Sequence, residues 1–173
     1  MDAITQAQTF ATTGASEAWT LILSFLALII ITGVLFAFSL RAGKSSLVSL
    51  ILSFYIGYAI YQVFPYADAI LAIGKGSAVT LVVAKLVIYA IATYIPFYVI
   101  NRHASNDYFV PNKLIALFAC FLAAAFLMAI GYHTFGAKSA YAFTPALDML
   151  FAPASYFFWW FIAPLAGVYL LVR

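Results

Sequence analysis

The sequence predicts an all-α fold, a polytopic transmembrane helical bundle of four to five spans with a short interfacial helix before the last segment. Hydrophobic residues make up 67% of the 173 residues and charged residues only 8%, whereas soluble domains are roughly 25% charged. The apolar residues are grouped in stretches close to the ~20 residues that cross the hydrocarbon core of a bilayer. Because exposed apolar surface costs about 25 cal/mol per Å² in water, we expect lipid around the outside of this bundle.

Five apolar segments are the candidate spans, and they follow a short polar segment at residues 1–18. We expect the spans at residues 19–40, 47–64, 78–100, 114–132 and 156–172, within a single transmembrane domain at residues 19–173. The last segment is short and contains Pro164 and Gly167. It therefore crosses with a tilt or a kink, or lies partly in the interface.

Basic residues in the short loops predict the orientation. Five of them fall on one side of the membrane: Arg41, Lys44, Arg102, Lys113 and Arg173. Lys75 and Lys138 fall on the other side. Since Lys and Arg are enriched in cytoplasmic loops, we expect a multi-pass protein of the cell inner (plasma) membrane. Five spans place its N-terminus outside and its C-terminus in the cytoplasm.

The short helix before the last span is expected to begin near Thr144. Thr144 suits an N-cap, and Pro145 suits the first helical position. Asp148 would share this helix with apolar neighbours, namely Leu147, Leu150 and Phe151. A short amphipathic helix of this kind is typical of the membrane interface.

The sequence GKSS at residues 43–46 suggests a nucleotide site at first sight. A phosphate-binding loop needs a glycine five residues before Gly43, but Phe38 stands there, inside a predicted span. The Lys and Arg residues also form no tract suited to a phosphate backbone. We therefore interpret Arg41 and Lys44 as anchors of a cytoplasmic turn, and we expect no nucleic-acid partner.

Small residues form a stripe along the second span. Ser45, Ser49, Ser53 and Gly57 recur at every fourth position, so they lie on one face of a helix. Lipid tails give helices no hydrophobic reason to associate, and close packing of small residues supplies the contact instead. We predict a helix-packing seam along this stripe.

Polar residues within the spans allow two interpretations. The second span carries Tyr58, Tyr61 and Gln62, and the third carries Lys85 and Tyr89 on one face. A charge at membrane depth suggests a functional site, so these residues are a candidate polar path for an ion or a substrate. They can equally make structural contacts, with the Lys85 ammonium reaching the outer interface or pairing with an aspartate there.

Residues typical of catalysis or metal binding are few. His103 and His133 are expected in loops on opposite sides of the membrane, so one chain cannot bring them to a single metal ion or haem. Cys120, the single cysteine, is expected to pack within the fourth span. The sequence contains neither an H-E-x-x-H motif nor paired carboxylates within a span. We therefore expect no catalytic residue, no metal, no cofactor and no enzymatic activity.

Four stretches of the chain share the layout of a bacterial family. They are SLRAGKSSLVSLILSFYIGYAI, AVTLVVAKLVIYAIATYIPFYVINR, NKLIALFACFLAAAFLMAIGY and LDMLFAPASYFFWWF. In their order and residue types they resemble the colicin V production protein (CvpA-like) family of inner-membrane proteins. The resemblance implies a role in secretion or envelope homeostasis and supplies no catalytic residue. The hydrophobic final segment departs from the amphipathic ending of that family.

These observations predict an integral inner-membrane protein without a catalytic site. We expect it to work in the lipid bilayer as a homo-oligomer or with other membrane proteins of the envelope. The alternative is a small channel or transporter component. Lys85, the tyrosines of the spans and the two prolines within spans, Pro96 and Pro164, favour that alternative.

Overall fold

The computed structural model describes residues 25–66, 72, 77–103, 112–140 and 144–172. The elements in these ranges are all helices, as predicted. Four helices are long and apolar enough to cross a membrane, which is compatible with a multi-pass integral membrane protein. They are α2 (Leu26–Val63), α4 (Ala78–His103), α5 (Lys113–Ile130) with its π-helical continuation η1 (Gly131–Phe135), and α8 (Ala154–Val172). The predicted polar segment 1–18 and the predicted start of the first span lie outside the described residues.

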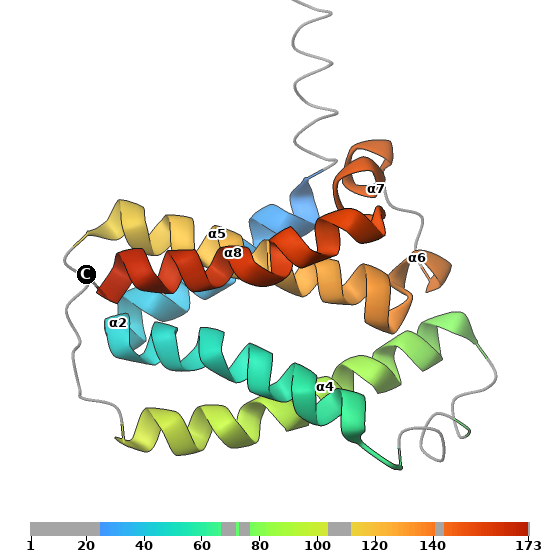
Figure 1. Ribbon diagram of the computed structural model, residues 1–173, viewed down its shortest axis with the longest axis horizontal. Coiled ribbons are helices and arrows are strands. Elements are labelled where there is room, and N and C mark those ends of the chain that lie inside the picture. Colours follow the sequence, from blue (N-terminus) through green and yellow to red (C-terminus); the bar gives the residue numbers. More distant parts are fainter. Residues whose placement is uncertain (1–24, 67–71, 73–76, 104–111, 141–143, 173) are drawn as a thin grey trace, which may run out of the picture.

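Helix α2 covers most of the first two predicted spans, which are joined at a single glycine. Gly43 has φ 85° and ψ 176°, a backbone conformation that is essentially restricted to glycine. The first half, residues 26–42, runs toward the left end of the bundle in Figure 1, and the second half, residues 44–63, runs back to the right. Together with α4, α5 and α8, the two halves supply an apolar segment for each of the five predicted spans.

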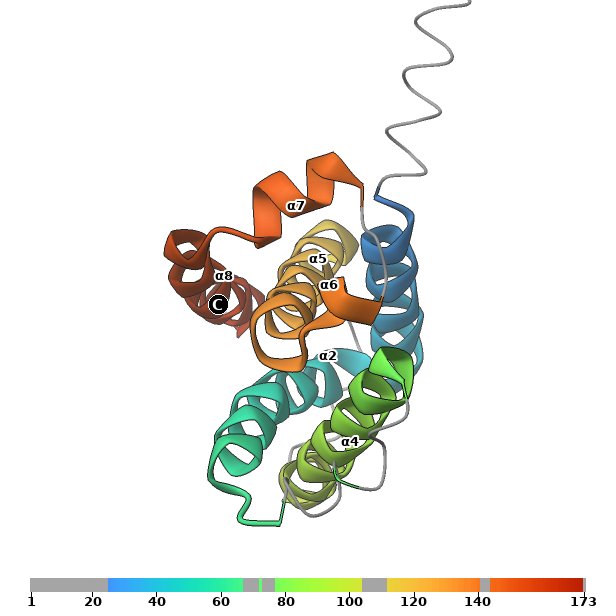
Figure 2. The same cartoon turned by 90° about the vertical axis from the view of Figure 1, so that its right-hand side faces the viewer.

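Helix α5 lies at the centre of the bundle and packs against both α2 and α8 (Figure 2). Its inward side chains are small and fully buried: Ala116, Ala119, Cys120, Ala123 and Ala124. Small side chains let neighbouring helices approach closely. On α8, a Cβ atom built at Gly167 would lie 3.2 Å from the Cα of Ala119. Cys120 is therefore a packing residue.

Neither intrahelical proline interrupts its helix. Pro96 lies within α4 and Pro164 within α8, and both are buried. The predicted last segment forms one continuous helix of 19 residues, which runs antiparallel to α5 (Figure 1). Because of its length and apolar composition, α8 is among the four candidate spanning helices.

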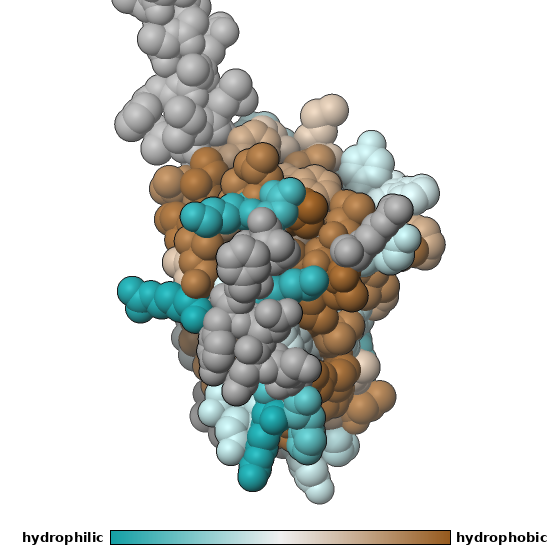
Figure 3. Space-filling model, turned by 90° about the vertical axis from the view of Figure 1, so that its left-hand side faces the viewer, coloured by the Kyte–Doolittle hydropathy of each residue, from teal (hydrophilic) through white to brown (hydrophobic). Residues whose placement is uncertain are grey.

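One end of the bundle gathers the basic residues predicted to anchor the topology. The bend of α2, the C-terminal ends of α4 and α8 and the N-terminal end of α5 all lie at the left of Figure 1. These segments carry Arg41, Lys44, Arg102 and Lys113. The Lys44 Nζ also donates to the Val172 carbonyl oxygen at 3.5 Å. Figure 3 looks onto this end and shows hydrophilic side chains among apolar ones.

The opposite end carries two short helices, α6 (Ala137–Ala140) and α7 (Pro145–Phe151). Thr144 occupies the N-cap position of α7 and Pro145 its first turn, so the predicted short helix is confirmed. Leu147 and Phe151 of α7 are both buried. They are four residues apart and therefore lie on the same face of the helix.

Candidate functional site

Three of the predicted polar-path residues converge on one residue, Phe135 of η1. The ring centroids of Tyr61 and Tyr89 lie 5.3 and 5.4 Å from that of Phe135. The Lys85 Nζ donates to the Phe135 carbonyl oxygen at 3.5 Å. We call Lys85, Tyr89, Tyr61 and Phe135 the Phe135 cluster. It joins α2, α4 and the end of α5.

The position of Phe135 depends on the π-helical turn. A π-helix is wider than an α-helix and recurs at functional sites, and here it ends at Gly136, which has φ 69°. The Gly136 N–H donates to the Gly131 carbonyl. Carbonyl groups at a helix C-terminus carry partial negative charge, so the Lys85 ammonium stabilises this end. Sequence reasoning missed the π-helix, for which the only signal is the pair of glycines around residues 131–136.

Helices α2 and α4 also meet one turn farther along α4. The Tyr89 hydroxyl donates to the Phe54 carbonyl oxygen at 3.1 Å. Gly57 lies directly against Thr93, whose Oγ1 is buried. The Tyr89 hydroxyl is a polar neighbour of this Thr93 oxygen. These groups fix how α4 crosses the second half of α2.

Tyr58 and Gln62 make their described contacts on the side of α8. Gln62 Nε2 donates to the Tyr58 hydroxyl at 2.7 Å, and the Tyr58 ring lies 6.0 Å from that of Phe161. Nearby, the Tyr55 hydroxyl donates to the Phe161 carbonyl at 2.6 Å, and the Tyr55 ring stacks on Phe126 at 4.6 Å. The five predicted polar-path residues therefore belong to two groups.

The small-residue stripe of the second span faces inward within this chain. Ser49 and Ser53 are buried, and each hydroxyl donates to a carbonyl of its own helix: Ser49 to Ser45 at 2.9 Å and Ser53 to Ser49 at 2.6 Å. These bonds satisfy the hydroxyls without a second helix. Gly57 continues the stripe at the contact with α4.

An apolar pocket of about 590 Å³ lies next to the Phe135 cluster. Its walls come from α2, α4, α5 and η1, and α4 contributes Leu86, Tyr89, Ala90, Thr93, Tyr94 and Phe97. Ligand pockets in proteins are typically about 300–1,000 Å³ and mostly apolar with a few polar groups. Leu86 and Tyr94 are exposed, so the pocket opens on the outer surface of α4.

A second polar network ties α7 to the end of α5. Lys138 Nζ lies 2.8 Å from Asp148 Oδ2, and the Tyr132 hydroxyl donates to Asp148 Oδ1 at 3.1 Å. The hydrogen bond from Lys138 is the main reason that the pKa of Asp148 lies below its ordinary value of 3.8, and the bond from Tyr132 lowers it further. His133 Nε2 lies 2.9 Å from the Phe151 carbonyl oxygen. Asp148 is thus engaged by Lys138 and Tyr132, while the described hydrogen bond of Lys85 is to the Phe135 carbonyl.

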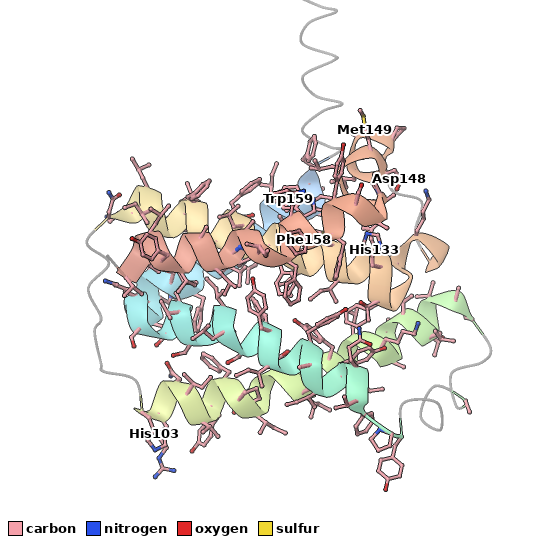
Figure 4. All side chains as sticks on the ribbon, in the orientation of Figure 1. His103, His133, Asp148, Met149, Phe158 and Trp159 are labelled. Carbon is pink, nitrogen blue, oxygen red and sulfur yellow. The ribbon has the colours of Figure 1, made fainter. Side chains whose placement is uncertain are left out.

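The two histidines lie at opposite ends of the bundle (Figure 4). The prediction that both lie in loops was wrong, because His103 is the last residue of α4 and His133 belongs to η1. Helix α4 extends beyond the predicted span by one more turn, and the π-turn continues α5. Among the described residues, no group of three or more His, Cys, Asp or Glu side chains could hold a metal ion.

Within the described helices, several polar side chains are bonded to a carbonyl oxygen or to each other. The hydroxyls of Tyr55 and Tyr89 donate to backbone carbonyls of neighbouring helical segments, and Trp160 Nε1 donates to the Leu150 carbonyl at 3.2 Å. Such bonds stabilise helix contacts in lipid. The arrangement suits dry packing beside a lateral pocket better than a row of free polar groups across the bundle.

Comparison of the chain with protein-family models, curated proteins and solved structures gave no match.

Proposed function

We propose that this chain is a non-enzymatic integral protein of a bacterial inner membrane that works as a non-conducting component of a larger membrane assembly. The observation that carries the proposal is the internal bonding of polar groups. Tyr55 and Tyr89 each donate to a backbone carbonyl of another helical segment. A conducting path needs polar groups free to replace the hydration of an ion, and these groups hold helices together instead.

Two further features support an assembly. The described residues lie almost entirely in apolar helices, which favours contacts within the membrane as a means of acting on other molecules. The layout also resembles the CvpA-like family, which implies a role in secretion or envelope homeostasis. The partner in the assembly is a second copy of the chain or another membrane protein.

The face that meets a partner lies on the outside of the bundle. The predicted seam residues Ser49 and Ser53 are buried within the chain, so cysteines there would not report on partners. The first half of α2 offers an exposed alternative around Gly33, where an added Cβ atom would meet nothing within 4 Å. Val34 beside it is 63% exposed. A small residue on an exposed helical face permits close approach of another helix.

Crosslinking in native membranes tests the assembly. Cysteines at Val34 (first half of α2) and Val87 (α4), in a Cys120→Ala background, would be treated with a thiol-specific crosslinker. Cys120 is buried, and its removal leaves only the introduced thiol. We expect a discrete species larger than the chain at one of these positions. A chain that stays monomeric at both positions would contradict the proposal.

A small transporter component is the second candidate, and the lateral pocket is the observation that favours it. The pocket borders the Phe135 cluster with its lysine, and intramembrane lysines are typical of substrate paths. Flux of ions and small solutes into vesicles reconstituted with the purified protein separates the two candidates. We expect no flux above that measured in protein-free vesicles. A flux that Lys85→Gln abolishes would establish the transporter and reject the non-conducting assembly.

A further inference from the structure

We propose that the apolar pocket and Lys85 together form a binding site for an anionic phospholipid. One acyl chain fills the pocket, and the phosphate lies at the Lys85 ammonium. The site needs no partner protein, so it goes beyond the proposed function and stands or falls independently of it.

The pocket opens where membrane lipid would surround the helix. Leu86 and Tyr94 line it and are 46% and 64% exposed. Around them, α4 presents further exposed apolar side chains, namely Val83, Val87, Ile91 and Ile95. A lipid chain can therefore enter sideways from the bilayer without crossing water.

The shape of the pocket suits an extended chain. Its wall residues on α4 run from Leu86 to Phe97, a distance of about 16 Å at 1.5 Å per residue. They recur at spacings of three and four residues, so they lie on one face of the helix. The opposite walls are mainly aliphatic and aromatic, with Leu50, Phe54, Leu127 and Met128 among them.

The positive charge lies at one end of this wall. Lys85 precedes Leu86, and it shares the face of Tyr89 one turn earlier. Its Nζ lies 3.5 Å from the Phe135 carbonyl oxygen, and Phe135 and Ala137 both line the pocket. The ammonium is thus placed beside the η1 end of the pocket, near the end of the bundle, where a phosphate group would lie.

No carboxylate of the described residues pairs with the charge of Lys85, which can therefore attract an anion. An ammonium has three donors, and one long hydrogen bond to the Phe135 carbonyl uses one of them. Within the described ranges the one ion pair is between Lys138 and Asp148, so no described carboxylate neutralises Lys85. Lysine beside a membrane surface favours anionic over zwitterionic lipid.

A photoreactive phospholipid tests the site directly. The intact protein would be reconstituted in nanodiscs that contain a phosphatidylglycerol analogue with a diazirine in one acyl chain, and in matched discs with the phosphatidylcholine analogue. After illumination, mass spectrometry locates the labelled residues. We expect phosphatidylglycerol to label wall residues of α4 and α5 around Thr93 to Phe97 and Leu127 to Gly131. Labelling confined to the outer faces of the helices would overturn the proposal.

Two variants separate the chain-binding and phosphate-binding parts. Ala90→Phe fills the pocket and should reduce wall labelling at least tenfold, whereas Val87→Phe, on α4 but outside the pocket wall, should not change it. Lys85→Gln should weaken the apparent affinity for phosphatidylglycerol by about fivefold and leave phosphatidylcholine labelling unchanged. Lys113→Gln, which removes a lysine at the other end of the bundle, is the control for charge.

Each other occupant gives a distinct result. If both phospholipids label the wall equally, and if Lys85→Gln does not change that labelling, the proposed site for anionic lipid is overturned. Labelling blocked by added free fatty acid, together with no phospholipid adduct, would assign the pocket to a single-chain ligand and overturn the proposal. A crosslink between two copies of the chain through wall residues would assign the pocket to a helix instead. The thermal midpoint of each variant checks that it is folded.

Discussion

Gly57 of α2 lies directly against Thr93 of α4, and a Cβ atom built at Gly57 would lie 2.9 Å from the Cα of Thr93. Real Cβ atoms essentially never come this close to another backbone atom. The absence of a side chain at Gly57 therefore sets the distance between the two helices. That distance in turn positions the Tyr89 hydroxyl to donate to the Phe54 carbonyl at 3.1 Å.

Gly57→Ala should destabilise the bundle by about 1–3 kcal/mol, the usual cost of overpacking. The added methyl group would force α2 and α4 apart. The free energy of unfolding in detergent micelles measures the effect. Gly33→Ala is the matched control, because nothing lies within 4 Å of an added Cβ atom there. Equal effects of the two substitutions would show that the contact does not limit packing.

Gly43→Ala should also destabilise the protein, for a different reason. Its φ of 85° and ψ of 176° cost a residue with a side chain about 1–3 kcal/mol. The two halves of α2 should still insert, because each is apolar on its own. The same unfolding measurement, combined with protease protection of the inserted chain, checks both points. An unchanged stability would mean that the bend relaxes without cost.

Tyr55→Phe removes one hydrogen bond and leaves the ring. The Tyr55 hydroxyl donates to the Phe161 carbonyl at 2.6 Å, and interhelical bonds in membrane proteins average about 0.6 kcal/mol and reach about 1.7. We expect a loss of stability within that range. Tyr169→Phe, at a side chain that is 65% exposed, should lose less than half as much. A comparable loss at Tyr169 would contradict the assigned bond.

The docking of α7 should weaken in acid. Lys138 and Tyr132 hold the pKa of Asp148 below 3.8, so the carboxylate stabilises the folded state above that pH and loses its contribution as the pH falls through the lowered value. The difference in thermal midpoint between the wild type and Asp148→Asn should therefore be largest near neutral pH and vanish in acid. The difference in thermal midpoint caused by Asp148→Asn should be smaller in a Lys138→Gln background. It should also be smaller at high salt. A difference independent of pH would rule out the ion pair as its cause.

Cysteine labelling tests the orientation predicted from the basic residues. In a Cys120→Ala background, Ser46→Cys and His103→Cys place thiols at the basic end of the bundle, and Met149→Cys places one at the other end, where Met149 is 81% exposed. A membrane-impermeant maleimide applied to intact spheroplasts should label Met149→Cys and spare the other two. Inverted vesicles should give the opposite pattern. Labelling of all three from one face would refute the orientation.

Several elements follow from local sequence because their causes are local. Long apolar stretches require helices in lipid, since a helix satisfies its own backbone hydrogen bonds. Predicted residues 78–100 and 156–172 correspond to α4 and α8 within three residues at each end. Thr144 and Pro145 predicted the start of α7 in the same way. Basic residues near Gly43 also indicated a turn, but not that a single glycine would form it.

The candidate site could not be predicted in the same way, because its contacts join distant parts of the chain. Tyr89 meets Phe54 across 35 residues, and Tyr55 meets Phe161 across 106. The sequence identified Lys85 as an intramembrane charge, yet its hydrogen-bond partner is a backbone carbonyl in a π-helix whose only sequence signal was a pair of glycines. Every residue has a backbone carbonyl. The sequence therefore does not show which carbonyl a helix end leaves available to accept a hydrogen bond.

The amino-acid sequence by itself determined an all-helical, apolar chain whose long segments match a bilayer, since these properties depend on composition and on neighbouring residues. Only the tertiary structure decided that the predicted polar-path residues divide between a cluster around Phe135 and contacts with α8, and that a pocket opens beside Lys85. The physical reason is that helix packing depends on the shapes of surfaces brought together from separate segments. The contact between Gly57 and Thr93, for example, exists only because two such surfaces meet there.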